Sequence, residues 1–388
     1  MEELAAVLSA AGHDALLILA ESSRDPALAP FVGPVHLGRA LLVATREGSV
    51  SVGLFTDMER EEAARCGARV LEAEALGVPE GLRKGLSAAD LWAAAATAAV
   101  GGAGVGPPGR LALAGHPAAG AAVAVAAHLG AAGWEVVDGD SLVRRARRRK
   151  DEAAVRSARR AAAGTCRAFR AVARTLRAAA PDGDGRLWLA GERLRAGHLR
   201  EAVARALVPW GLEQPVGNIV AAGRDAGVPH SEGDSARELA AGEALVVDLF
   251  PRGELFADCT RTFCVGVAPE ALRAAHEIVV AALRAAHEAA RPGVRGWDLQ
   301  EAACERFHAA GRPTPIHDEG TRRGYVHNLG HGVGYELHEL PSFSHASGDD
   351  GVLAPGDLLT LEPGLYDPDE GWGVRVEDLV LIGEERTE

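Results

Sequence analysis

Residues 246–263, VVDLFPRGELFADCTRTF, place two aspartates in a segment rich in Val, Leu, Phe and Thr. Two apolar runs flank a polar turn that contains Gly253, a pattern that predicts a β-hairpin. Asp248 and Asp258 are ten residues apart and symmetric about Gly253, so a symmetric hairpin would place them directly opposite each other on one face. Two opposed carboxylates repel each other without a counter-charge, and we therefore expect a cation between them.

A second acidic hairpin is expected near the C-terminus. Strands in 357–366 and 374–383 flank the polar turn DPDEGWG and carry Glu362 and Glu377. Arg375 alternates onto the face of Glu377, where it could hold a ligand carboxylate or a substrate carboxylate, or serve only as a salt-bridge partner. Each hairpin carries two acids, which suggests an internal pseudo-repeat.

Three histidines lie between the hairpins, in HNLGHGVGYELHE at 327–339. His331 sits between glycines, where small neighbours let the backbone come close to a bound group. One imidazole and four carboxylates make an oxygen-rich ligand set that suits Mn²⁺, Co²⁺ or Fe²⁺ as well as Zn²⁺. Two such metals can bridge a hydroxide nucleophile and polarise a carbonyl, so the sequence predicts metal-assisted hydrolysis, with amide bonds as the leading target. The predicted ligands are Asp248, Asp258, His331, Glu362 and Glu377.

The first 147 residues predict an α/β domain without a reactive constellation. Expected strands lie at 15–19, 40–45, 50–55 and 110–115, and expected helices at 86–100 and 118–133.

A run of basic residues at 144–150 is either a phosphate or nucleic-acid patch or a linker into a long helix at 150–179. The formal net charge of −13 favours the linker and argues against nucleic acid or an anionic membrane as a partner. We therefore predict domains at 1–147 and 148–388.

The five cysteines form no CxxC pair, which indicates reduced thiols and a cytoplasmic protein. The acidic start of the chain does not fit a secretory signal, and its apolar stretches are too short to span a bilayer.

The ordered motifs VVDLF, DCTRTF, HNLGHGVGYELHE, LEPG and VRVED resemble the creatinase/aminopeptidase "pita-bread" metallopeptidase family over residues 148–388. Within that family they are most similar to the Xaa-Pro dipeptidases (prolidases) and aminopeptidase P enzymes. The resemblance implies a pita-bread catalytic domain preceded by a smaller α/β N-terminal domain. The family's two aspartates are commonly eleven apart, so the spacing of ten here is a departure that bears on substrate preference.

The resemblance also implies a role for each ligand in a dinuclear centre. Asp248 would chelate one metal, His331 and Glu362 would hold the second, and Asp258 and Glu377 would bridge both. The metals would be two divalent ions, Mn²⁺ first, with Co²⁺, Zn²⁺ or Fe²⁺ as alternatives.

Further residues are assigned catalytic roles by the same resemblance. Glu362 would be the acid/base that moves the proton of the attacking water, and His338 would stabilise the tetrahedral intermediate or shuttle a proton. His230, in GVPHSEG, and His327 would line the substrate pocket, with Arg375 beside them.

The expected substrate is a peptide with proline at its second position, cleaved by a homodimer. Dipeptidase and aminopeptidase P preferences stay open. So do a hydrolase or lyase of this fold that acts on a small non-peptide substrate, and a catalytically silent binding protein.

Overall fold

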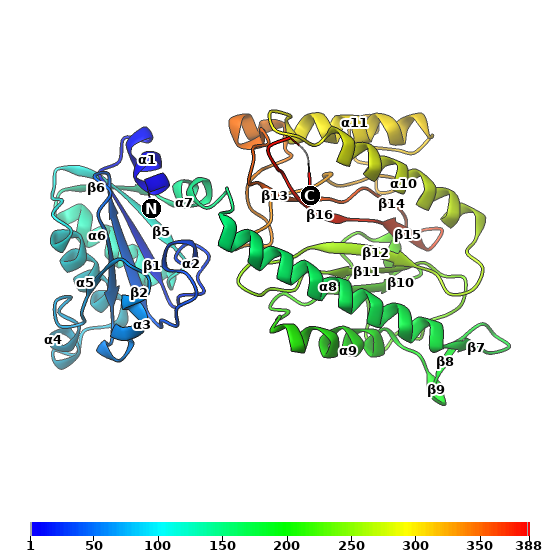
Figure 1. The fold of residues 1–388 in the computed structure, drawn as a ribbon, viewed down its shortest axis with the longest axis horizontal. Helices are drawn as coiled ribbons and strands as arrows, with labels where there is room; N and C mark the ends of the chain where they lie inside the picture. Colours follow the sequence, from blue (N-terminus) through cyan, green and yellow to red (C-terminus); the bar gives the residue numbers. More distant parts are fainter. Residues whose placement is uncertain (1, 386) are drawn as a thin grey trace. The chain divides into compact units, whose positions relative to one another are not determined.

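The computed structural model describes residues 2–385 and 387–388 and divides into two compact units, Met1–Arg147 and Arg148–Glu388 (Figure 1). Both units combine helices and strands, which confirms the mixed α/β class expected from the sequence. Within the described residues, no helix is both long enough and apolar enough to cross a membrane.

The first unit is built on a six-stranded sheet in the order β4-β3-β2-β1-β5-β6. Residues of β1 alternate between its two faces, so Leu17 packs with α5 and α6 while Leu16 packs with α1 and α7. All the expected strands and both expected helices are present, and the sheet contains two further strands, β4 and β6, that the sequence did not predict. The elements are α1 Glu2–Ala10, β1 Ala15–Ala20, α2 Ala29–Val32, β2 Ala40–Thr45, β3 Val50–Leu54, α3 Arg60–Ala64, β4 Arg69–Leu71, α4 Val78–Arg83, α5 Ala88–Gly102, β5 Gly109–Gly115, α6 Ala119–Ala131, β6 Trp134–Asp138 and α7 Asp140–Ala146.

The second unit opens with α8, whose first turn is capped by the Asp151 side chain accepting a hydrogen bond from the Ala154 amide. Four helices and several short sheets make up the unit (Figure 1). The elements are α8 Glu152–Ala178, β7 Ala180–Pro181, β8 Leu187–Leu189, β9 Glu192–Arg193, α9 Ala196–Leu207, β10 Ile219–Ala222, β11 Leu245–Leu249, β12 Cys259–Phe263, α10 Glu270–Ala289, α11 Gly296–Ala309, β13 Leu358–Leu361, β14 Gly364–Asp367, β15 Trp372–Arg375 and β16 Asp378–Leu381.

The first predicted hairpin forms, but its register differs from the symmetric one. β11 pairs with β12 so that Asp248 lies opposite Thr260, not opposite Asp258. Farther along the same hairpin Arg252 bridges to Phe256, so the turn is centred one residue later than Gly253. When the centre of the turn moves by one residue, the residue opposite Asp248 changes by two positions, from Asp258 to Thr260. A shift of two positions keeps the same side chains on the same face of the sheet. Asp248 and Asp258 are therefore diagonal neighbours on one face, and the expected direct opposition is wrong.

The second hairpin has the expected register across two ladders. β13 pairs with β16, with Leu361 opposite Asp378, and β14 pairs with β15, with Gly364 opposite Arg375. The same residue offset in both ladders places Glu362 opposite Glu377, at the gap between them.

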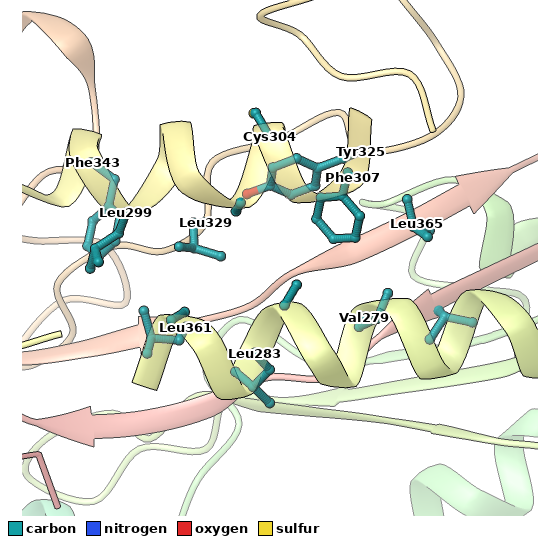
Figure 2. Packing of buried hydrophobic residues seen from close by; sticks show 14 of the residues in the cluster. Val279, Leu283, Leu299, Cys304, Phe307, Tyr325, Leu329, Phe343, Leu361 and Leu365 are labelled. Carbon is teal, nitrogen blue, oxygen red and sulfur yellow. The ribbon is translucent and has the colours of Figure 1, made fainter. Parts of the chain in front are cut away.

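The core of the second unit supports the residues that neighbour the predicted ligands. Figure 2 shows Leu361 and Leu329 packed with Leu283 of α10 and Leu299 of α11. Leu361 directly precedes Glu362, and Leu329 lies two residues before His331, so burial of both leucines anchors two ligand-bearing segments.

The basic run at 144–150 leads into α8, and two of its residues, Arg148 and Lys150, form ion pairs that the sequence did not predict. Arg148 makes a two-pronged contact with the fully buried Asp357, at 2.8 Å and 2.6 Å. Lys150 Nζ lies 2.6 Å from Glu339 Oε1, and both of these side chains are only 1% exposed. Charged residues are rarely buried unless paired, and here the partners lie about two hundred residues away in sequence.

Candidate metal centre

The predicted ligands converge in the second unit from two hairpins and the loop that carries His331. One donor atom from each of Asp258, His331 and Glu377 lies within 4.8 Å of the other two. Glu362 joins them, with its Oε1 3.5 Å from His331 Nε2, and Asp258 Oδ2 lies at the same distance from that nitrogen. Asp248 stands on the same hairpin face as Asp258. The five side chains thus form one cluster.

The carboxylates of this cluster are buried without enough positive charge to balance them. Burial, reinforced by the neighbouring carboxylates, raises the pKa values of Asp258 and Glu377 well above their ordinary range. Burial raises the pKa of Glu362 to about 8, and the nearby Asp248 adds to this shift. Oδ1 of Asp248 and Oδ1 of Asp258 are buried with no hydrogen-bond partner in the described chain. Buried carboxylate oxygens without a partner, in a cluster of acidic side chains, fit divalent metal ions as the missing partners.

The imidazole of the cluster is prepared to act as a ligand. Burial lowers the pKa of His331 to about 3, so the ring is neutral at physiological pH. Its Nδ1 lies 3.1 Å from the carbonyl oxygen of Gly332, which assigns the ring proton to Nδ1. Nε2 is left to point its lone pair at the carboxylates.

The glycines beside His331 lie in close contact with neighbouring backbone. A Cβ on Gly330 would lie 2.0 Å from the Thr360 carbonyl oxygen, and a Cβ on Gly332 would lie 2.1 Å from the Leu340 carbonyl group. The glycines therefore let the His331 segment pack against neighbouring backbone. Thr360 N donates to His331 O at 2.8 Å, which fixes the segment on β13.

Arg375 holds a predicted ligand. Its Nη2 donates to Asp248 Oδ2 at 2.7 Å, and the guanidinium is almost completely buried. Its Nε donates to Thr260 Oγ1 at 3.0 Å, and Thr260 Oγ1 in turn donates to Glu377 Oε2 at 2.6 Å. Thr260 is a site residue that the sequence analysis did not identify, although the two-residue strand period puts it on the face of Asp258. The sequence left three roles open for Arg375. Its contact with Asp248 matches the first of them, which is to hold the carboxylate of a predicted ligand.

A directional chain of hydrogen bonds runs from Arg375 to His327 through Tyr366. Arg375 Nη1 donates to Tyr366 Oη at 2.9 Å, and Tyr366 Oη lies 2.8 Å from His327 Nε2. His327 Nδ1 is 2.7 Å from the Asn328 carbonyl oxygen, so Nδ1 carries the proton and Nε2 accepts from the tyrosine. Burial lowers the pKa of His327 to about 3, in agreement with a neutral ring.

Both ring nitrogens of His327 thus have protein partners, and neither is left for a substrate. Sequence reasoning missed Tyr366, although the two-residue strand period puts it on the face of Glu362.

The other two predicted histidines lie at the exposed side of the cluster. His338 and His230 are both exposed to solvent. The His338 ring meets the His331 ring edge-on, with centroids 4.1 Å apart. Burial, and then the nearby His230, lower the pKa of His338. These two imidazoles are the ones that a molecule approaching from solvent can reach.

Known proteins resemble this chain in sequence over part of its length. An Xaa-Pro dipeptidase of Pyrococcus furiosus is 39% identical over 179 residues, which are 45% of this chain and 47% of the relative. The matched stretch thus spans about half the length of that protein.

Solved structures resemble the chain over nearly its whole length. The prolidase of Pyrococcus horikoshii OT3 has a TM-score of 0.75 at 22% identity, covering 100% of this chain and 96% of that one. The X-Pro aminopeptidase of Thermotoga maritima MSB8 has a TM-score of 0.74 at 21% identity, covering 97% and 95%. These likenesses confirm the expected fold, a pita-bread domain preceded by a smaller α/β domain.

Residues 156–384 match the metallopeptidase family M24. Because this match covers more than half of the sequence, the chain belongs to metallopeptidase family M24.

Proposed function

We propose that this chain is a dinuclear metal-dependent peptidase that hydrolyses the peptide bond before proline. The observation that carries the proposal is the buried cluster of four carboxylates and one neutral imidazole, in which two carboxylate oxygens have no hydrogen-bond partner among the described residues. Proline specificity draws its support from the names of the relatives, which include an Xaa-Pro dipeptidase.

The donor set assigns the residues that would hold the metals: Asp248, Asp258, His331, Glu362 and Glu377. Two divalent ions held there would lower the pKa of a water molecule and polarise the scissile carbonyl. We propose Mn²⁺ for this role, with Co²⁺, Zn²⁺ or Fe²⁺ as alternatives, because oxygen-rich sites accept several of these ions.

The side chains of the cluster divide the remaining tasks. Glu362 would accept the proton of the attacking water and pass it to the leaving amine nitrogen, since a positioned carboxylate can take up and release a proton in such a step. His338, exposed beside His331, would donate a hydrogen bond to the oxyanion that develops on the carbonyl. His230 would contact the substrate from the same exposed side. Arg375 would orient the Asp248 carboxylate, and His327 would hold Tyr366 in place.

We further propose a cytoplasmic homodimer as the working form. The five cysteines are all free thiols in the structure, which suits a reducing compartment.

The test uses purified full-length protein, freed of metal with a chelator and reloaded with Mn²⁺ or Co²⁺. We expect turnover of Xaa-Pro dipeptides that disappears on chelation and returns on reloading. Xaa-Pro-Xaa tripeptides in the same assay separate a dipeptidase from an aminopeptidase P. If the reloaded protein shows no chelator-sensitive turnover of any Xaa-Pro substrate, the proposal fails.

A further inference from the structure

We propose that Arg261 is a positioning residue for the metal centre: its guanidinium holds the main chain of Glu377 against the strand that follows Asp258. The inference rests on the proposed function insofar as it takes Glu377 and Asp258 to be metal ligands. It concerns a residue that lies outside the ligand cluster, on the opposite face of β12 from Thr260.

Glu377 is attached to β12 at three points. Its amide donates to the Thr260 carbonyl oxygen at 3.1 Å, and its carboxylate accepts from Thr260 Oγ1 at 2.6 Å. Its carbonyl oxygen accepts from Arg261 Nη1 at 2.6 Å. The Cys259 thiol also donates to this carbonyl, at 3.0 Å, but thiols are weak donors. Arg261 therefore supplies the strong contact that fixes the peptide plane following the ligand.

The planar fork of the guanidinium allows it to tie two hairpins together. Nη1 donates to the carbonyl oxygens of Thr260, at 2.8 Å, and of Glu377, while Nη2 donates to Asp378 Oδ1 at 2.7 Å. Thr260 lies on β12, whereas Asp378 begins β16, and these strands belong to different sheets. No ladder hydrogen bond of either sheet joins Thr260 to Glu377 and Asp378, so their separation is held by the Glu377 amide bond to the Thr260 carbonyl oxygen together with the Arg261 guanidinium. Arginine suits the task because its donors are rigidly arranged.

Asp378, the carboxylate partner of Arg261, is also contacted by a side chain of α10. Asp378 Oδ2 lies 3.1 Å from Nε2 of His287, so one carboxylate receives Arg261 on one oxygen and His287 on the other. The side chains of Arg261 and Asp378 are 40% and 34% exposed. Removing the guanidinium would therefore leave no fully buried charge, and the fold should tolerate its loss.

Loss of the Arg261 guanidinium should lower the metal affinity of the centre. Without Arg261, the carbonyl of Glu377 keeps only the thiol, and the carboxylate of this residue gains rotational freedom relative to Asp258. Partners that orient metal ligands from outside typically contribute about 10–100-fold to metal affinity or activity.

The experiment compares Arg261→Met with a matched control in the full-length protein. Arg237→Met removes a guanidinium of similar exposure, 34%, which pairs with Glu243 at 2.8 Å and donates to the Glu238 carbonyl oxygen. Neither of these partners is a candidate ligand. Metal-free samples of each protein are titrated with MnCl₂ by calorimetry.

We expect R261M to weaken Mn²⁺ binding by about 10–100-fold and R237M to leave it unchanged. Turnover of R261M at limiting Mn²⁺ should fall and return with excess Mn²⁺, a rescue that a general folding defect would not show. Equal affinities for R261M and the unsubstituted protein would overturn the inference, as would equal losses in both variants.

A second variant, Arg261→Lys, covers the case in which R261M does not fold. Lysine keeps the charge but cannot present the fork, so we expect a smaller loss of Mn²⁺ affinity, and an unchanged affinity would overturn the inference. The titration needs no substrate, so it separates this inference from the proposed function. A protein that binds Mn²⁺ but cleaves no Xaa-Pro bond contradicts only the function, whereas an active protein whose R261M variant binds normally contradicts only the role of Arg261.

Discussion

Gly330→Ala should disable the metal centre by displacing His331. The added Cβ would lie 2.0 Å from the Thr360 carbonyl oxygen, whereas real Cβ atoms essentially never come closer than 3.0 Å to another heavy atom. The two segments must therefore separate by about 1 Å, in conflict with the 2.8 Å hydrogen bond from Thr360 N to His331 O. The obstacle is backbone, which cannot rotate away as a side chain would.

The magnitude follows from this displacement. Overpacking of a well-packed interior costs about 1–3 kcal/mol, and in a unit of this size each kcal/mol lowers the melting temperature by about 2–4 °C. A ligand shifted by about 1 Å can lower kcat/KM by about 10²-fold. We expect both losses together, measured by differential scanning calorimetry and by turnover of an Xaa-Pro dipeptide.

A matched glycine in the same unit provides the control. Gly183 has no atom within 4 Å of a built Cβ, and neither it nor Gly330 has the left-handed φ that would strain an alanine. Gly183→Ala should leave the melting temperature and kcat/KM unchanged. A G330A variant with unaltered stability and activity would refute the steric reasoning.

Three further predictions address the charges of the second unit. Glu362→Gln keeps the side chain's shape but cannot carry a proton, so kcat should fall by about 10²–10⁴-fold while circular dichroism stays unchanged. Burial and neighbouring carboxylates raise the pKa of Glu362 from its ordinary 4.5 to about 8, and raise those of Asp258 and Glu377. A raised pKa contributes stability at low pH that is lost as pH rises through the folded-state value. The metal-free protein should therefore lose stability as the pH rises from about 4.5 to about 8, the range over which Glu362 titrates. Urea denaturation with and without Mn²⁺ tests this, and a metal-free protein equally stable across the range would contradict it. Lys150→Met should lower the free energy of unfolding, measured by urea denaturation, by about 3–5 kcal/mol because the buried Glu339 carboxylate loses its positively charged partner. Adding Glu339→Leu should restore most of this stability. Equal stability of the single and double variants would argue against the importance of the ion pair.

Much of the candidate site could be predicted because its residues occur in local patterns. Charged residues that alternate with Val, Leu and Thr mark one strand face, so Asp248 and Glu377 stood out from their neighbours. Hairpins are local structures, and both were predicted. The offset between Asp248 and Asp258 was not, because it depends on how the turn after Pro251 closes.

The amino-acid sequence alone determined which side chains are available as ligands, the strand faces they share and the α/β class, since strand alternation and hairpin formation act between residues close in the chain. Only the tertiary structure decided which distant residues contact the predicted ligands and the other buried carboxylates. Arg375 reaches Asp248 across 127 residues, Arg261 reaches Glu377 across 116, and Lys150 reaches Glu339 across 189. Contacts over such separations depend on how whole elements pack, and no local periodicity encodes them.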